Sequence, residues 1–560
     1  MTLLEEFQAE VRAVVARAAH IPRDQVTLEA PPPDIDADLA FPCFSLAKKY
    51  RKAPPLIAQE LAGKIKPRGL IRVVTSQGPY LNFTADWAAL GSRLLKAAAQ
   101  PGWGKAPARK ERILVEYAQP NTHKAFHIGH CRNIVLGEAL CRVLEHAGCA
   151  VIRVNYQGDI GPHVAKVLWG LQHLKPKEPA KGKGRWLGEV YALASKAVEG
   201  HPKKEEEVRE LNKQLYARDK RLVQLWEKTR KWSLEDFQRI YQDFGVSFRR
   251  LYFEGEVEAR GAEISRNLLT RKVAKLSQGA IVMDLEKEGL GIWVLLTQDQ
   301  TPLYSAKDFA LAELQEKEFH PSQLIHVVAA EQQLHFRQLI ASLGKFSPAL
   351  ARKEVHLPYE LVNLSSGKMS SRTGDIITYD ELREEVVAHA LEVTQQHSKE
   401  KNLQDIARQV GMGAIVYDLV KQSPEKVIVF DWAQALSFDG NAAPYLQYTC
   451  ARARSIMEKA GAWGPGFHAA LLNDKRERLL LRTILAFPDE VLRAARDRRP
   501  HYLANYAYHL ATCFNEFYQN LSVLRAEPGE REARLALVRA VHTTLATALQ
   551  LLGIQVPEKM

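Results

Sequence analysis

Two histidines stand on either side of a glycine in the segment His127-Ile128-Gly129-His130. The apolar pattern predicts a strand before this segment, at 113–117, and a helix after it, over 130–147. A glycine lets a phosphate approach the backbone closely, and a helix N-terminus offers free N–H groups and a partial positive charge. Imidazole nitrogens can also donate to phosphate oxygens. The segment therefore suits phosphate binding, although a turn with surface histidines has the same composition.

A second cationic segment lies far downstream, where residues 366–372 read Ser-Gly-Lys-Met-Ser-Ser-Arg. Small residues surround Lys368 and Arg372, so these side chains can act as mobile cations beside a phosphoryl transition state, in which negative charge is spread over several oxygens. The segment is not a P-loop, because the first glycine of that motif is missing. On its own, the composition favours a solvated basic turn.

The order of the predicted elements indicates the scaffold that holds these two segments. A second strand at 151–154 follows the helix, and a strand–helix–strand of this length is typical of a parallel, doubly wound sheet with its ligand site at the strand C-termini. We predict an α/β catalytic domain over 106–425. It contains a helical insertion at about 165–260 and, at 365–375, the loop that carries the second cationic segment, which we call the second-motif loop. The α/β pattern returns after the insertion at 280–283 and 323–328. An N-terminal α+β domain (1–105) precedes this unit, and an all-helical C-terminal domain (426–560) follows it.

Composition limits the class of protein. The chain has 560 residues, of which 46% are apolar, and this excludes a disordered or collagen-like chain. The 77 Lys and Arg outnumber the 65 Asp and Glu by 12, which weakly favours a polyanionic partner. Six cysteines without a Cys-x-x-Cys pair make a zinc knuckle or dithiol site unexpected and fit a reducing compartment. The acidic start MTLLEEFQAE does not resemble a secretory signal, and no membrane-spanning run is expected.

Taken together, and in this order, the two segments resemble the two signatures of class I aminoacyl-tRNA synthetases, a family with a Rossmann-type catalytic domain. The second signature usually ends in lysine, but Ser371 stands at that place. The flanking residues 115–127 resemble the arginyl-tRNA synthetase family, which often lacks that final lysine. In this family a lysine three residues before the first histidine, here Lys124, is understood to replace it. Further segments resemble the same family at 155–159, 328–336, 438–448 and 552–560.

The resemblance implies which residues form the site. A guanidinium needs a carboxylate presented as a fork, and Tyr304 and Asp308 are four residues apart, so in a helix they would face one pocket. The family's second carboxylate falls on Glu256, with Glu254 as the alternative. The implied arginine-binding residues are Glu116, Asn121, His127, Glu256, Tyr304, Asp308 and Gln332. The implied ATP-binding residues are His127, Gly129, His130, Lys368, Met369, Ser370 and Arg372, and the implied catalytic residues are Lys124, His127, His130 and Lys368.

The resemblance also implies tRNA contacts. Tyr80 and Asn82 lie in a segment similar to the one with which the family's N-terminal domain reads a D-loop adenosine, and Tyr445 lies at the start of the anticodon-binding bundle. A purely structural role for Tyr80 and Asn82, as one face of a strand, is the alternative.

The expected activity is the ATP-dependent formation of arginyl-adenylate and its transfer to the 2′-OH of the terminal adenosine of tRNA(Arg). We expect Mg²⁺ with ATP, no zinc and no organic cofactor, and a cytoplasmic monomer without a membrane partner. Two rival hypotheses stay open at this point: a class I enzyme for another substrate, and a nucleic-acid-binding protein that has lost catalysis.

Overall fold

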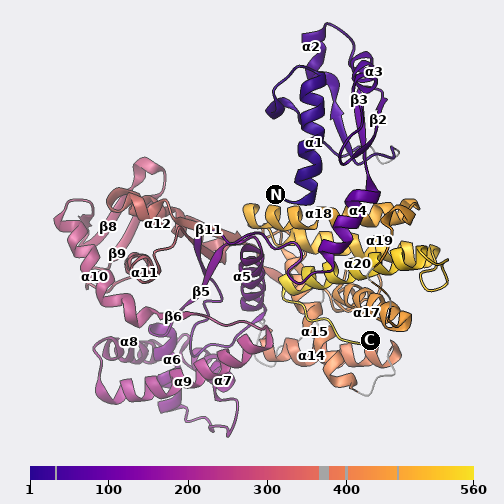
Figure 1. Ribbon diagram of the computed structural model, residues 1–560. Coiled ribbons are helices and arrows are strands. Elements are labelled where there is room, and N and C mark those ends of the chain that lie inside the picture. The colour runs from indigo at the N-terminus through magenta and orange to yellow at the C-terminus, as the bar shows by residue number, and fades with distance from the viewer. Residues whose placement is uncertain (32–34, 365–376, 398–401, 463, 465) are drawn as a thin grey trace.

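The computed structural model describes residues 1–31, 35–364, 377–397, 402–462, 464 and 466–560. An N-terminal unit projects from a C-terminal helical bundle, and a central parallel sheet lies beside that bundle with the helical insertion below it (Figure 1). The predicted class, a parallel-sheet catalytic core with an N-terminal unit and a C-terminal helical domain, is confirmed. One hydrophobic core runs without a break from the N-terminal unit through the catalytic unit into the bundle.

The N-terminal unit packs helices on a three-stranded antiparallel sheet of order β1-β3-β2. Helix α1 (Leu3–Ala18) begins with a capping box, in which the Thr2 and Glu5 side chains each bind the other residue's backbone N–H. The strands are β1 (Leu39–Pro42), β2 (Ile71–Gln77) and β3 (Tyr80–Ala85). The helices are α2 (Ala47–Tyr50), α3 (Pro54–Lys64) and α4 (Trp87–Ala98). Strands β2 and β3 form a hairpin around Gly78-Pro79, and β1 pairs with β3 at the edge of the sheet.

The central sheet has five parallel strands in the order β11-β10-β4-β5-β6. Their bounds are β4 (Arg112–Glu116), β5 (Ala150–Gln157), β6 (Arg250–Phe253), β10 (Gln323–Ala329) and β11 (Glu354–Tyr359). The chain runs outward from β4 through β5 to β6 and then returns to the other side of β4. The direction of winding therefore reverses between β4 and β10, and ligands bind at such a switch point, beyond the carboxyl ends of the strands.

Two segments interrupt the sheet. Four helices form the insertion between β5 and β6: α6 (Pro162–His173), α7 (Lys183–Val198), α8 (Pro202–Tyr216) and α9 (Lys220–Asp243). The insertion thus ends before β6, and residues 250–253 of the predicted insertion belong to the sheet. The second interruption lies between α10 (Glu254–Thr270) and α11 (Tyr304–Phe319). It is an antiparallel sheet of β7 (Lys275–Ser277), β8 (Ala280–Leu285) and β9 (Gly291–Leu296).

The segment 280–283 was predicted to rejoin the parallel sheet, and this prediction is wrong because it lies in β8 of the separate antiparallel sheet. A run of four apolar residues indicates a strand but not its partner. Helices α12 (Gln333–Phe346) and α13 (Pro348–Ala351) then connect β10 to β11, and two short strands, β12 (Val362–Leu364) and β13 (Ile428–Phe430), pair in parallel.

Two helices, α14 (Tyr379–His397) and α15 (Leu403–Val420), follow β12 within the span predicted for the catalytic domain. The C-terminal span 426–560 was predicted to be all-helical, but it begins with strand β13; the rest is helical, with α16 (Trp432–Ala435), α17 (Ala443–Ala460), α18 (Lys475–Asp497), α19 (His501–Asn520) and α20 (Glu530–Leu552). By length and composition α20 could span a membrane, but 67% of its most apolar window is buried inside the molecule. It is therefore a core helix of the bundle, in contact with α17, α18 and α19.

Helix α5 (Ile128–His146) joins the two halves of the molecule, because it packs on the central sheet and also contacts α15, α18 and α20. Almost all of its residues are buried, so its face against β4 requires close packing. A Cβ added to Gly137 would lie 2.4 Å from the ring of Tyr117, which is itself fully buried. The helix can approach the strand end only with glycine at this position.

We predict that Gly137→Ala lowers the free energy of unfolding by about 1–3 kcal/mol, since an extra methyl group in a packed core forces neighbouring atoms to move. Urea unfolding of the whole chain measures this change. Gly63→Ala is the matched control: it is also a helical glycine, but no atom lies within 4 Å of the added Cβ. That variant should be unchanged or slightly more stable. Equal stability of Gly137→Ala and wild type would contradict the packing argument.

Candidate active site

The loop after β4 has an unusual backbone. Ala118, Gln119 and His123 all have positive φ angles, of 77°, 44° and 65°, although none of them is glycine. Such conformations persist only where the surrounding structure fixes them, and they concentrate at functional sites. His123 is held from α9, where the Ser233 hydroxyl accepts from its N–H at 2.9 Å, and Ala118 is held by the buried side chain of Asn133 on α5. Its Oδ1 accepts from the Ala118 N–H, and its Nδ2 donates to Val327 O at 2.8 Å.

His127 ends this loop as the N-cap of α5, and its ring lies back over the helix. The Gly129 N–H donates to His127 Nδ1 at 3.2 Å, and the His127 N–H donates to His130 Nδ1 at 3.3 Å. A Cβ on residue 129 would lie 3.0 Å from the His127 ring, which explains the glycine between the histidines. Because each Nδ1 accepts a hydrogen bond, the proton of each neutral ring is on Nε2.

Both rings are held in the neutral form. Burial, followed by the charge of Lys124, lowers the pKa of His127 to about 4. Burial lowers the pKa of His130 well below its usual value, and His127 and Lys124 add to the shift. The two rings are in contact, with centroids 3.8 Å apart. At neutral pH the motif therefore presents two uncharged N–H donors at a helix N-terminus, which is a suitable arrangement for binding phosphate.

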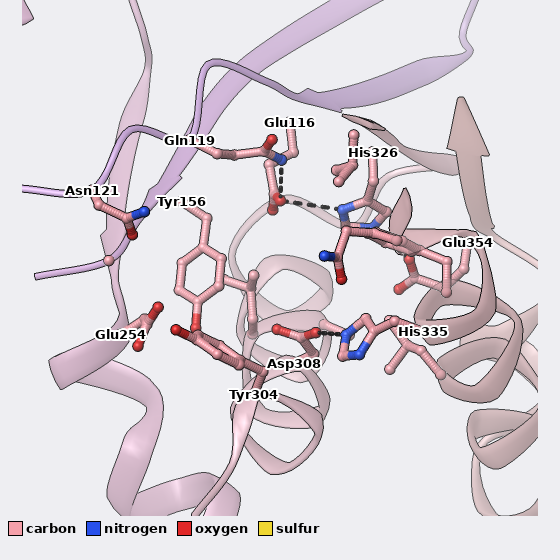
Figure 2. A pocket seen from close by; sticks show the side chains of 17 residues that line it. Glu116, Gln119, Asn121, Tyr156, Glu254, Tyr304, Asp308, His326, His335 and Glu354 are labelled. Carbon is pink, nitrogen blue, oxygen red and sulfur yellow. Dashed lines mark hydrogen bonds and ion pairs between the residues drawn. The ribbon is translucent and has the colours of Figure 1, made fainter. Parts of the chain in front are cut away.

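Beside this loop, a cavity of about 370 Å³ opens at the carboxyl edge of the sheet (Figure 2). Four strands each supply a lining residue at or shortly after their carboxyl ends. Strand β4 supplies Glu116, β5 supplies Gly158, β6 supplies Glu254 and β10 supplies Gln332. The remaining lining residues are Gln119, Asn121, Tyr156, Tyr304, Asp308, Leu311, Ala312, His326, Val328, His335, Phe336, Leu339 and Glu354. The cavity thus lies at the switch point of the sheet.

Two of the carboxylates in this cavity share one imidazolium. His326 lies between Glu116 and Glu354, with nitrogen–oxygen distances of 3.3 Å and 2.6 Å, and all three side chains are buried. These carboxylates raise the pKa of His326 well above its usual value despite burial, so the ring is charged. Gln119 and Gln315 also donate to Glu116, at 2.9 Å and 2.6 Å. Both Glu116 oxygens are thus hydrogen-bonded, whereas Glu354 Oε1 is buried and has no hydrogen-bond partner among the described residues.

The other two carboxylates face the cavity more directly. The Lys307 ammonium binds Glu254 Oε2 at 2.8 Å, and both side chains are almost completely buried. Burial nonetheless raises the pKa of Glu254 to about 7, because it outweighs the attraction of Lys307. Asp308 Oδ2 accepts from His335 Nε2 at 2.5 Å. The four carboxylates together form an acidic pocket that suits a cationic ligand.

Comparison with known proteins identifies the architecture. Three family models match consecutive parts of the chain: "Arginyl tRNA synthetase N terminal domain" at residues 5–85, "tRNA synthetases class I (R), catalytic domain" at 92–432, and "DALR anticodon binding domain" at 446–560. The chain is 36% identical over 545 residues to the arginine–tRNA ligase of Bdellovibrio bacteriovorus, covering 94% of this chain and 93% of that protein. The chain belongs to the arginyl-tRNA synthetase family.

Other relatives agree. The arginine–tRNA ligase of Clostridium perfringens is 33% identical over 547 residues, which are 95% of this chain and 96% of that protein. The solved structure of arginyl-tRNA synthetase from Thermus thermophilus superposes with a TM-score of 0.83 at 30% identity, covering 98% of this chain and 99% of that one. The rival interpretation of the motifs as a class I enzyme of another family is therefore excluded.

Within this family fold, the structure places most of the expected arginine-binding residues in one cavity. Tyr304 and Asp308 lie on successive turns of α11 and both line it, together with Glu116, Asn121 and Gln332. His127 does not line it, but the loop that ends at His127 supplies Gln119 and Asn121. Lys307, the neighbour of Asp308 in the chain, binds Glu254 and not Asp308.

The structure does not bring Glu256 into the cavity. Its side chain is directed outward and pairs with Arg250, whereas Glu254 is buried and lines the pocket. The geometry therefore favours Glu254, the alternative left open by the sequence. The physical signal was available, because Glu254 directly follows the strand β6, and residues just after parallel strands point into the ligand site.

Several pocket residues carried no assignment from the sequence: Gln119, Tyr156, His326, His335 and Glu354. Tyr156 is notable because its hydroxyl is buried and has no hydrogen-bond partner among the described residues. His326 and Glu354 face each other across two strands that are adjacent in the sheet but distant in sequence, so only the fold could reveal the pair. His335 belongs to the family-like segment 328–336, but the motif itself does not indicate its role.

Lys124 lies on the insertion side of the loop, where its ammonium is 5.1 Å from the centre of the Tyr191 ring. Lys166 approaches the same ring at 5.7 Å. Within the described part of the chain, neither lysine has a carboxylate within ion-pair distance, so both charges are available to an anion. Lys368, Met369, Ser370, Ser371 and Arg372 lie outside the described residues, as does the whole of the predicted loop 365–375.

The expected tRNA-binding residues lie far from this cavity. Tyr80 is half-buried on β3, with its ring 6.0 Å from that of the exposed Phe44. Asn82 is 1% exposed, and neither its amide nitrogen nor its oxygen has a hydrogen-bond partner among the described residues. Tyr445, at the start of α17, packs against Tyr508 with ring centres 5.9 Å apart. No group of three or more His, Cys, Asp or Glu among the described residues is arranged to hold a metal ion.

The depressed pKa of His127 predicts a pH-dependent stability. The folded value is about 4 and the usual value is 6.5, so the unfolded chain binds this proton more tightly. Stability should therefore be lost as the pH falls from about 6.5 toward 4, by about 2 kcal/mol between pH 7.5 and pH 5.

Urea unfolding at these two pH values tests the prediction. His127→Gln should reduce the stability difference between them by about that amount. His20→Gln, which replaces an exposed histidine in the N-terminal unit, is the control and should keep the wild-type difference. An unaltered difference in His127→Gln would show that the ring is not held neutral by the fold.

Proposed function

We propose that this chain is an arginine–tRNA ligase. It activates L-arginine with ATP to arginyl-adenylate and diphosphate, and it then transfers the arginyl group to the 2′-OH of the terminal adenosine of tRNA(Arg). The observation that supports this proposal is the position of the acidic cavity. It lies directly beside a loop that ends in two neutral N–H donors at the N-terminus of α5. A cationic amino acid and a nucleotide phosphate can therefore meet at the same switch point.

The cavity suits arginine because its lining combines carboxylates with the uncharged amides of Asn121 and Gln332. Glu254 and Asp308 are close enough for the charge of Asp308 to raise the pKa of Glu254. A guanidinium between them would keep both in the charged form, because an opposite charge favours ionisation. Asn121 and Gln332 would hold the α-amino and α-carboxylate groups nearer to the loop, which directs the substrate carboxylate toward the phosphates.

The first chemical step needs positioning and charge rather than proton transfer. One oxygen of the arginine carboxylate attacks the α-phosphorus of ATP, and the bond to the leaving diphosphate breaks. Nε2–H groups of His127 and His130 donate to the phosphate oxygens, and Lys124 neutralises the charge that develops on them. Lys368 and Arg372 supply further positive charge in this proposal, with Gly129, Met369 and Ser370 completing the nucleotide site. Mg²⁺ arrives with ATP and is held largely by the phosphates.

The N-terminal unit offers a place for a nucleobase. The buried amide of Asn82 has two unused donors and an acceptor, and Tyr80 and Phe44 form an aromatic pair above the same strand. A base stacked on Tyr80 could hydrogen-bond to the amide, and this would remove the cost of leaving the amide unpaired. We infer that Tyr80 and Asn82 contact the tRNA elbow and that Tyr445 contacts the anticodon arm. We further propose that the enzyme is a cytoplasmic monomer.

Two assays test the function itself. Amino-acid-dependent exchange of diphosphate into ATP, run with a panel of amino acids and with tRNA present, should respond to arginine alone. Charging of tRNA with labelled arginine should then follow. Exchange driven by another amino acid, or binding of tRNA without charging, would refute the proposal.

Glu254→Gln should raise the arginine KM by roughly 10- to 150-fold, the range expected from the loss of one charge-assisted hydrogen bond. The ATP KM should change little. Glu256→Gln is the matched control, because this carboxylate is two residues away, pairs with Arg250 and lies outside the cavity. Its arginine KM should equal that of wild type. A rise in Glu256→Gln but not in Glu254→Gln would reverse the assignment.

Tyr80→Ala should raise the tRNA KM by roughly 5- to 150-fold, because a base–aromatic stack contributes about 1–3 kcal/mol. Arginine and ATP KM values should remain close to wild type, since the N-terminal unit is remote from the cavity. Thermal unfolding separates this role from a structural one. Reduced thermal stability with an unchanged tRNA KM would make Tyr80 a packing residue only.

A further inference from the structure

His335, near the start of α12, is the sole described hydrogen-bond partner of the Asp308 carboxylate. Its Nε2 lies 2.5 Å from Asp308 Oδ2, and the two side chains are only 22% and 16% exposed. Figure 2 shows this pair on the side of the cavity opposite Gln119 and Glu116. The carboxylate therefore has one oxygen bound within the protein, while no described group binds Oδ1.

The imidazole is itself held in place. Its ring packs edge-on against Trp293 of β9, with centroids 5.2 Å apart, and against Phe336 at 5.8 Å. Trp293 and Phe336 are buried in a separate hydrophobic cluster that also includes Phe309 of α11. A ring fixed on two sides by aromatic neighbours leaves its partner carboxylate little freedom to rotate. The orientation of Asp308 is thus set by α12 and β9 and not only by its own helix α11.

Glu254 is arranged in the same way. Lys307 binds its Oε2, and no other described side chain or backbone N–H binds this carboxylate. Glu254 and Asp308 thus each have one oxygen bound internally and one oxygen free, and so does Glu354, whose Oε1 has no partner among the described residues. A planar guanidinium has N–H groups along several edges and can reach two separate acceptors at once. A lysine ammonium is a compact point charge and is better satisfied by a single carboxylate with both oxygens available.

We propose that His335 is a specificity-determining residue, which positions Asp308 so that the pocket accepts a guanidinium in preference to an ammonium. This inference rests on the proposed function and assigns a new role within it. His335 acts through Asp308, so it is a positioning residue. Its loss releases the second oxygen of Asp308, lets the carboxylate rotate, and makes the site more suitable for a compact cation.

The test compares His335→Leu, His335→Gln and wild type in diphosphate exchange with arginine and with lysine, tRNA being present. His335→Leu should raise the arginine KM by roughly 10-fold or more with kcat nearly unchanged, as expected for the loss of a hydrogen bond to a charged group. The preference for arginine over lysine, as a ratio of kcat/KM, should fall. His335→Gln places an amide N–H close to the former Nε2 position and should restore most of both values.

His356→Leu is the matched control. His356 also packs against Phe336, with ring centres 4.4 Å apart, but it binds Val328 O and does not line the cavity. The proposal is overturned if His356→Leu raises the arginine KM and lowers the preference for arginine as His335→Leu does. It is also overturned if the arginine KM of His335→Leu equals that of wild type. Failure of the Gln variant to restore the arginine KM would also overturn it.

If His335→Leu does not fold, His335→Ala replaces it with the same expected result. Wild-type exchange with arginine tests the proposed function separately, so failure of that function is distinguishable from failure of the role of His335.

Discussion

One buried amide holds the active-site loop in place. Asn133 accepts from the Ala118 N–H and donates to the Val327 carbonyl, and it also lies within hydrogen-bond distance of Gln119 and Tyr359. It thereby fixes the left-handed residues that follow β4 and ties them to β10 and β11. Without this connection the strained backbone would relax, because positive φ angles at Ala118 and Gln119 are unfavourable for residues with side chains. The direction of Gln119, Asn121 and His127 depends on it.

The electrostatics of the cavity follow from burial. Four carboxylates cannot be buried together without compensation, since an unpaired charge in a water-poor site is costly. Each carboxylate therefore has a partner within the protein. His326 lies between Glu116 and Glu354, Lys307 binds Glu254, and His335 binds Asp308. The compensation is incomplete at Glu254, where burial still raises the pKa. A cationic ligand would complete the compensation of these negative charges, and this gives the pocket its preference for a cation.

The loop is also held from the side of the insertion. The Tyr379 N–H donates to the Phe126 carbonyl at 2.8 Å, so the start of α14 is joined to the histidine motif. Arg239 of α9 bridges Asp380 and Asp236, at 2.8 Å and 3.0 Å. Phe126, the residue before His127, therefore contacts the start of α14 and also packs against Phe237 of the insertion, with ring centres 5.8 Å apart. A ligand that moves the insertion would act on the same backbone that presents His127.

The sequence by itself determined the local features of this protein. The pattern of apolar residues predicted the strand–helix–strand around the histidine motif, and the spacing of Tyr304 and Asp308 placed both on one face of a helix. Such features depend on residues that are neighbours along the chain, so they can be inferred without knowledge of the fold. The tertiary structure decided what depends on distant segments. It placed 280–283 in a separate sheet, put Glu254 and not Glu256 in the lining of the cavity, and paired His326 with Glu354 and His335 with Asp308. Strand partners and the partners of buried charges are set by which segments meet in space, and a linear sequence does not record that.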